Sequence, residues 1–145
     1  MTDQKLIEHW IQGCAVQRVM FRDGLVVNLE DYNELVIAAP IRLTLPATAG
    51  SSVEVVSVDP YDPDVHERAL FAFSGAICTD VTWDDAGDLH VEFSDGHQID
   101  VAPEDNATAW ELYGKNHGYA ACLPHGKVRV VRHDMPEAAD LDERR

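Results

Sequence analysis

The chain has 145 residues, a formal net charge of −15 and 46% apolar residues, which is the size and composition of one globular domain. A charge this negative argues against a nucleic-acid or membrane partner, because both need a basic patch. No apolar run reaches the length of a membrane-spanning helix, and the first residues lack the pattern of a signal peptide. The composition therefore predicts a cytoplasmic protein.

Three cysteines, Cys14, Cys78 and Cys122, lie among apolar or small neighbours, and no two of them have the C-x-x-C spacing. An odd count with this spacing argues against a disulfide framework and against a four-cysteine zinc site. Free cysteine is among the most buried residue types. We therefore predict that all three are thiols in or near the core.

The first segment predicts a short amphipathic helix that begins after Asp3 and ends at Gly13. Its apolar residues share one helical face, with Trp10 docked on a sheet: Leu6, Ile7, Trp10 and Ile11.

Alternating apolar and polar residues then predict strands with one buried face and one wet face. The residues expected on the buried faces are Leu25, Val27 and Leu29; Ile41, Leu43 and Leu45; Ile77, Thr79, Val81 and Trp83; and Leu89, Val91 and Phe93. Strong turn signals between them are Asp23-Gly24 and Asp95-Gly96, since D-G pairs tolerate a positive φ. Tyr32-Asn33 and residues 84–87 are weaker turns of the same kind.

The strand pattern occurs twice, in residues 15–37 and 77–101. In the preferred register Phe21 matches Trp83, and the alternating residues of 25–29 match those of 89–93. A second register aligns residues 19–24 with 91–96. Both registers predict two similar meanders that pack face to face or close together as a barrel.

A short helix is predicted between these meanders, because Asp64 and Glu67 have the spacing of a capping box. Residues 110–113, 119–123 and 127–131 predict a third meander. The fold class is therefore α+β, mainly β: repeated antiparallel three-stranded meanders that form a sandwich or open barrel, with one or two short helices. We predict one domain over residues 1–132 and a disordered acidic tail over 133–145.

The side chains that could act in catalysis or bind a metal do not form a recognisable catalytic or metal-binding set. His117, Cys122 and His125 lack a fourth ligand for zinc, and the carboxylates of residues 59–67 lack the spacing of a calcium loop. Cys122 and His125 are not placed face to face by strand geometry. The sequence also contains no nucleophile elbow, zinc-protease helix or phosphate loop. We therefore predict no catalytic, cofactor-binding or metal-binding residues.

Three segments resemble the motifs of an actinobacterial family of small uncharacterised proteins. Residues 89–96 read LHVEFSDG, 110–114 read WELYG and 121–126 read ACLPHG. They are similar to that family's F-S-D-G, W-E-L-x-G and V-C-x-P-G-G motifs, with His125 at the first glycine of the last one. The resemblance spans most of residues 13–132. It implies a shared fold and source, and it brings no assigned activity.

These observations favour a non-enzymatic protein-binding module whose partner is another protein or a second copy in a homodimer. One version is an immunity-like protein whose acidic surface covers a basic toxin; this rests on layout alone. The alternative class is a small-molecule binder or an enzyme with a pocket between the meanders. The aromatic residues that would line such a pocket or surface are Trp83, Trp110, Tyr113 and Tyr119. Trp110 itself is predicted to lie in the core with Leu112, against the alternative of an anchor at a partner surface.

Overall fold

The computed structural model describes residues 10–132. Within them the chain forms eleven strands, one helix and one 3-10 turn. Their bounds are β1 Val16–Phe21, β2 Leu25–Leu29, β3 Asn33–Ile37, β4 Ile41–Leu45, β5 Glu54–Val58, α2 Val65–Ala69, β6 Cys78–Trp83, β7 Leu89–Phe93, β8 Gln98–Val101, β9 Trp110–Gly114, β10 Gly118–Cys122, η1 Pro124–Gly126 and β11 Val128–Arg132. Most of the expected N-terminal helix and the whole expected tail lie outside the described residues.

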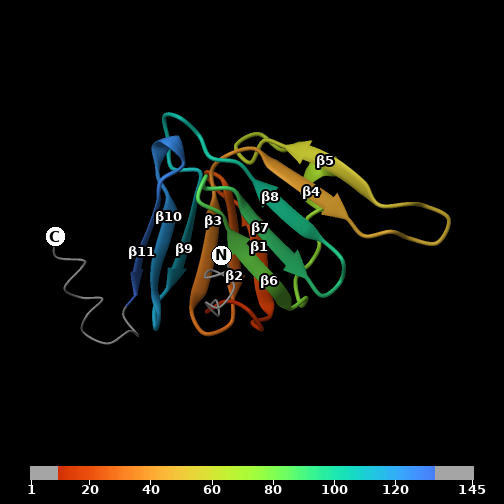
Figure 1. Cartoon of the computed structure of the whole chain (residues 1–145). Coiled ribbons are helices and arrows are strands. Elements are labelled where there is room, and N and C mark those ends of the chain that lie inside the picture. The colour runs from red at the N-terminus through yellow and green to blue at the C-terminus, as the bar shows by residue number, and fades with distance from the viewer. Residues whose placement is uncertain (1–9, 133–145) are drawn as a thin grey trace.

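The strands form two antiparallel sheets that do not close into a barrel (Figure 1). The six-stranded sheet has the order β1-β2-β3-β9-β10-β11, and the five-stranded sheet has the order β5-β4-β8-β7-β6. Side chains from both sheets build one hydrophobic core. The predicted mainly β fold, built from antiparallel meanders, is confirmed. No helix within residues 10–132 has the length and hydropathy needed to cross a bilayer.

The two sheets are joined where the start of β1 meets the start of β6. Gly13 N–H donates to Cys78 O, and Gly75 N–H donates to Val16 O, each at 2.7 Å. The spacing from Gly13 to Gly75 equals that from Val16 to Cys78, and it is also the spacing from Phe21 to Trp83 in the preferred sequence match. The next strands of that match, residues 25–29 and 89–93, are two residues further apart. An approximate two-fold axis at this junction therefore relates the two meanders, as expected of a duplication.

Each meander begins with a β-bulge in its first strand, at matching positions of β1 and β6. The bulge makes the predicted alternation of residues 77–83 wrong at its start. Cys78 is fully buried, whereas Ile77 and Thr79 face solvent. An extra residue on one strand reverses the facing of the residues beside it, and a simple period-2 pattern does not include one.

Each half of the chain then sends its next hairpin to the opposite sheet. β4 and β5 follow the first meander, yet β4 pairs with β8 of the second. β9 and β10 follow the second meander, yet β9 pairs with β3 of the first. β5 and β10 are therefore equivalent strands. They differ in one respect: β11 pairs with β10, whereas β5 is the last strand of its sheet among the described residues.

The turns follow the predictions with one correction. Asp23 and Gly24 both have positive φ, at 51° and 112°, and Gly96 has φ 101°. The turn expected at Tyr32-Asn33 lies one residue earlier, because Asp31 and Tyr32 take the left-handed conformation and Asn33 already belongs to β3.

The short helix and the third meander form as predicted. Asp64 caps α2 in a complete capping box with Glu67, although the helix ends at Ala69 rather than continuing towards Gly75. Strands β9, β10 and β11 coincide with the third meander. Cys78 and Cys122 are buried and Cys14 is half-buried, so the predicted thiols are confirmed.

Candidate functional site

The four aromatic residues singled out by the sequence separate into two pairs. Trp110 is fully buried, and its ring lies 5.2 Å from that of Trp83 between the sheets. Tyr113 and Tyr119 face outward on neighbouring strands of the six-stranded sheet, with ring centroids 4.8 Å apart. The structure therefore does not bring the four together around one pocket, and Trp110 occupies the core position predicted for it.

The residues of the sequence motifs serve packing between the sheets. Trp110 Nε1–H donates to Gly87 O at 3.0 Å. A Cβ atom on Gly87 would lie 2.8 Å from Cys122 Sγ, and one on Gly126 would lie 2.3 Å from Ala86 O. The W-E-L-Y-G and P-H-G segments thus hold the β6–β7 turn against η1. These contacts join the two sheets at the end of the molecule where the β6–β7 turn and η1 meet.

The metal-ligand types named by the sequence lie apart, as predicted. His117 Nε2 pairs with Asp31 Oδ2 at 2.7 Å at one end of the six-stranded sheet, while His125 sits in the turn at the other end. Burial, with the nearby Asp88 charge, raises the pKa of the Cys122 thiol. A raised pKa disfavours the thiolate that binds metals and attacks substrates. His117 and His125 therefore lie at opposite ends of the six-stranded sheet, and burial makes Cys122 a weaker nucleophile and metal ligand.

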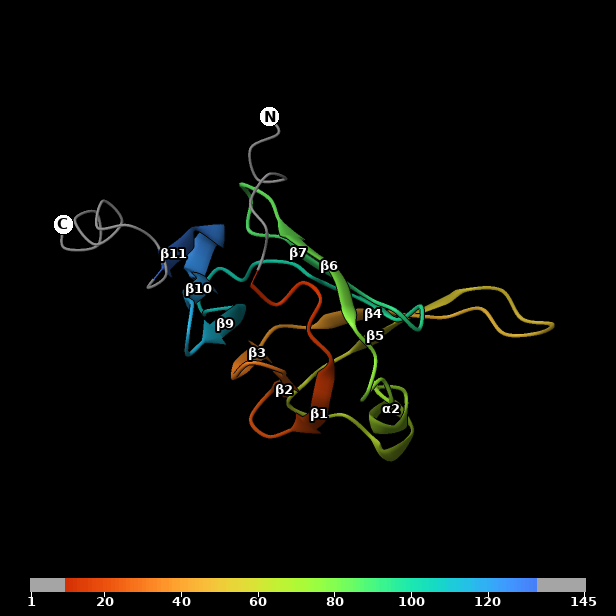
Figure 2. The same cartoon turned by 90° about the horizontal axis from the view of Figure 1, so that it is seen from below.

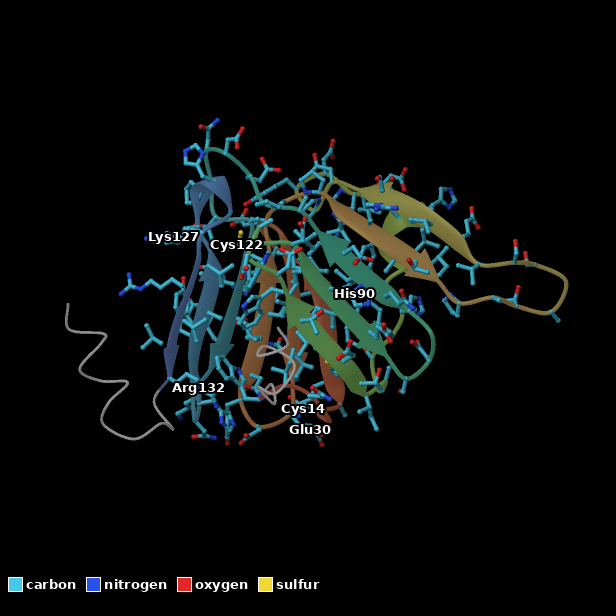
Figure 3. All side chains as sticks on the ribbon, in the orientation of Figure 1. Cys14, Glu30, His90, Cys122, Lys127 and Arg132 are labelled. Carbon is cyan, nitrogen blue, oxygen red and sulfur yellow. The ribbon has the colours of Figure 1, made fainter. Side chains whose placement is uncertain are left out.

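The outer face of the five-stranded sheet carries a polar row across all its strands. The residues opposite one another are Thr82, His90, Asp100, Arg42 and Ser57. Figure 3 labels His90 on the five-stranded sheet. Its Nδ1 lies 2.6 Å from Asp100 Oδ1, and its Nε2 lies 2.8 Å from Oε2 of Glu92, which is two residues along the same strand, so the ring lies between two carboxylates. The sequence analysis missed this row. Its members are the polar half of the same alternation that predicted the strands.

The His90 ring can satisfy both carboxylates only when it is protonated, since the neutral ring has a single N–H. Burial lowers the pKa of His90, but the hydrogen bonds and charges of Glu92 and Asp100 outweigh it and leave the pKa raised above 6.5. Asp80 offers a third carboxylate, within 4.8 Å of ligand atoms of His90 and Glu92. The imidazolium itself thus supplies positive charge to this acidic cluster.

The raised pKa predicts that His90 stabilises the fold below pH 6.5 and loses this contribution as the pH rises through the folded-state pKa. His90→Gln should therefore lower the free energy of unfolding at pH 5.5 by about 0.5–1 kcal/mol, the scale of partly exposed ion pairs, and by less at pH 8.5. Urea unfolding at both pH values measures the effect. The control is His66→Gln on the exposed face of α2. An equal loss for His90→Gln at both pH values would contradict the prediction.

At the end away from the junction of β1 and β6, the five-stranded sheet has β5 as its edge strand and the six-stranded sheet has β11. In the five-stranded sheet, Phe93 N–H donates to His97 O, which fixes the residues of β8 that bond to β7, because bonding alternates along antiparallel strands. The registers of β8 with β4 and of β4 with β5 then fix which residues of β5 bond to β4. The backbone N–H and C=O groups of Val55 and Ser57 do not bond to β4 and point away from the sheet. Figures 1 and 2 show the tip of the β4–β5 hairpin reaching away from the body of the molecule, and Figure 1 shows β5 along the outer side of its sheet.

The two edges differ in charge. Lys127, Arg129 and Arg132 make the β11 edge basic, and the labelled Lys127 and Arg132 lie towards its two ends in Figure 3. Residues 53–58 along the β5 edge read VEVVSV, with a single charge at Glu54. Val53 and Val55 are exposed at 56% and 48%. The sequence analysis did not predict β5, although four β-branched residues in six are a strand signal.

Comparison with known proteins identifies a family whose function is not known. One family model, described as a family of unknown function (DUF6188), matches residues 7–132. A search of curated proteins gives no match. A search of solved structures gives none either.

Proposed function

The chain belongs to the family of unknown function DUF6188, and from its structure we propose that it is a non-enzymatic protein-binding module. Its binding element is the β5 edge, which takes up an extended polypeptide segment as an additional strand. The observation that carries this proposal is the outward-pointing backbone of Val55 and Ser57, in a strand where Val55 and the preceding Val53 are exposed. Strand addition obtains affinity from main-chain hydrogen bonds and specificity from alternate side chains.

Natural proteins usually protect an edge with lysine, proline, a bulge or a covering segment. The register of β5 with β4 is regular from Glu54 to Val58, and residues 53–58 contain neither lysine nor proline. Such an edge favours pairing with another chain. The alternative of a pocket-based small-molecule binder or enzyme has less support, because Trp83 and Trp110 pack against each other between the sheets, whereas Tyr113 and Tyr119 lie on the outer face of the six-stranded sheet.

Selection of linear peptides on the immobilised protein tests the proposal. We expect enrichment of segments rich in β-branched residues that bind the wild type and fail to bind Val55→Pro. Proline is tolerated at an edge position whose N–H faces solvent, so this variant should fold while losing one donor to the added strand. The matched control is Val130→Pro on the β11 edge, which should leave peptide binding unchanged. Peptides that bind Val55→Pro as well as the wild type would contradict the proposal.

A further inference from the structure

We infer that the segment taken up by the β5 edge belongs to a second copy of this chain, so that two β5 strands pair antiparallel about a two-fold axis at Val56. This inference rests on the proposed function of the edge and names its partner. The paired five-stranded sheets become one continuous sheet through the dimer.

The internal symmetry shows that the position beside β5 fits a strand. β10, the equivalent of β5, pairs with β11 along its whole length, with Tyr119 opposite Val131 and Ala121 opposite Arg129. The corresponding residues of β5 are Val55 and Ser57, whose backbone groups point outward. The five-stranded sheet therefore has the hydrogen-bonding edge of its counterpart without the strand that covers it among the described residues.

The sequence of β5 is complementary to itself in the antiparallel direction. With the axis at Val56, Val55 lies opposite Ser57 of the second copy and exchanges two backbone hydrogen bonds with it. Glu54 lies opposite a valine, Val58. Asp59, just beyond the strand, lies opposite Val53. No like charges face each other across the pair, and the two Val56 side chains meet at the axis, so the pairing avoids the penalty for opposed like charges.

The β5 strand of a second copy fits better as the partner of β5 than the basic β11 strand of a second copy does. Pairing β5 with β5 uses the same surface on both subunits and closes after two copies. Pairing β5 with β11 of another copy joins different surfaces, and it continues into an open chain unless a ring closes. The closed arrangement yields a discrete dimer, which suits a chain that carries −15 charges per copy.

The net charge gives the dimer a characteristic salt dependence. Two copies of charge −15 repel each other, whereas the contacts at the β5 axis are hydrogen bonds and valine packing. Screening by salt weakens the repulsion and leaves the contacts nearly unchanged. The dimer should therefore become tighter as the ionic strength rises, in contrast to an association that rests on the basic β11 edge.

Sedimentation velocity over a concentration series tests the inference on the full chain. We expect a monomer–dimer equilibrium whose dissociation constant falls with added sodium chloride. Val55→Pro should raise this constant at least about 30-fold, because each dimer loses two hydrogen bonds worth roughly 1 kcal/mol each. Val130→Pro should leave it unchanged. Circular dichroism melting of both variants checks that they fold.

A cysteine at the axis tests the register. Residues opposed in a pair that shares no hydrogen bonds have Cα atoms about 4.5 Å apart, within disulfide range. Val56→Cys should therefore form a disulfide-linked dimer on mild oxidation, while Val130→Cys and the wild type should not. A wild type that stays monomeric, or a dimer dissociated by Val130→Pro, would overturn the inference. The proposed function would still stand if peptides bind the wild type and fail on Val55→Pro.

Discussion

Replacing Trp110 with alanine is expected to lower the free energy of unfolding by roughly 3–5 kcal/mol, the range for deleting a fully buried tryptophan. The ring is completely inaccessible to solvent and packs against Trp83. Its Nε1–H is bonded to Gly87 O, so the change also leaves a buried carbonyl without this donor. Denaturant unfolding followed by far-UV circular dichroism measures the loss, which is a large share of the 5–15 kcal/mol typical of a domain.

The control is Tyr113→Ala, in the same strand but on the opposite face, where Tyr113 is 43% exposed. It should cost far less, because a large part of its surface stays in water in the folded protein, whereas Trp110 is fully buried. A second variant, Trp110→Phe, keeps an aromatic ring against Trp83 but is smaller and lacks the donor to Gly87 O. Its loss should fall between the other two. A loss for Trp110→Ala no larger than for Tyr113→Ala would contradict the core role of this residue.

Local patterns were enough to predict the meanders. In β7, Leu89, Val91 and Phe93 are buried and the residues between them are not, because a half-buried strand imposes a period of two. The capping box at Asp64 was equally local, since all its hydrogen bonds form within one helical turn. Such features depend on residues a few positions apart, and the sequence displays them directly.

Features that depend on partners distant in sequence were not predictable in the same way. The exchange of the β4–β5 and β9–β10 hairpins between the sheets involves pairings such as β4 with β8, and no short pattern encodes them. The bulge in β6 lies beside the junction with β1, and it interrupts the alternation predicted for residues 77–83. β5 was missed because its valines run almost continuously, and its side chains are mostly exposed rather than alternately buried.

The candidate site also has one part that local sequence predicts and another that depends on residues distant in the sequence. The four aromatic residues were visible in the sequence, but the side of the sheet on which each one lies depends on register and burial. The β5 edge, which we propose as the binding element, could not be predicted from local sequence, because an edge is defined by the lack of a neighbouring strand. The internal duplication was the sequence feature that came nearest to predicting this edge. Once the two halves are aligned through the junction of β1 and β6, β11 is a strand that has no equivalent in the other half within residues 10–132.

Replacing Gly126 with alanine is expected to lower the free energy of unfolding by roughly 2–5 kcal/mol, from about 1–2 for a left-handed backbone and about 1–3 for overpacking. Gly126 has φ +86°, and a Cβ atom there would lie 2.3 Å from Ala86 O. The obstacle is backbone, which cannot rotate away as a side chain can. To relieve the overlap, the β6–β7 turn must move off η1, and this motion also displaces Gly87 O from Trp110.

Gly50→Ala separates the two contributions to this loss. Gly50 has a similar φ of +80°, but nothing lies within 4 Å of the position its Cβ would take. Alanine there should incur only the backbone cost, partly offset by the lower conformational entropy of the unfolded chain. The difference between the variants then measures how tightly the two turns approach each other over Trp110. Near-UV circular dichroism should change for Gly126→Ala alone, because only that substitution disturbs the surroundings of the paired indoles. Equal losses for the two variants would contradict the prediction, because they would show that the overlap of the added Cβ atom with Ala86 O adds nothing to the loss of stability.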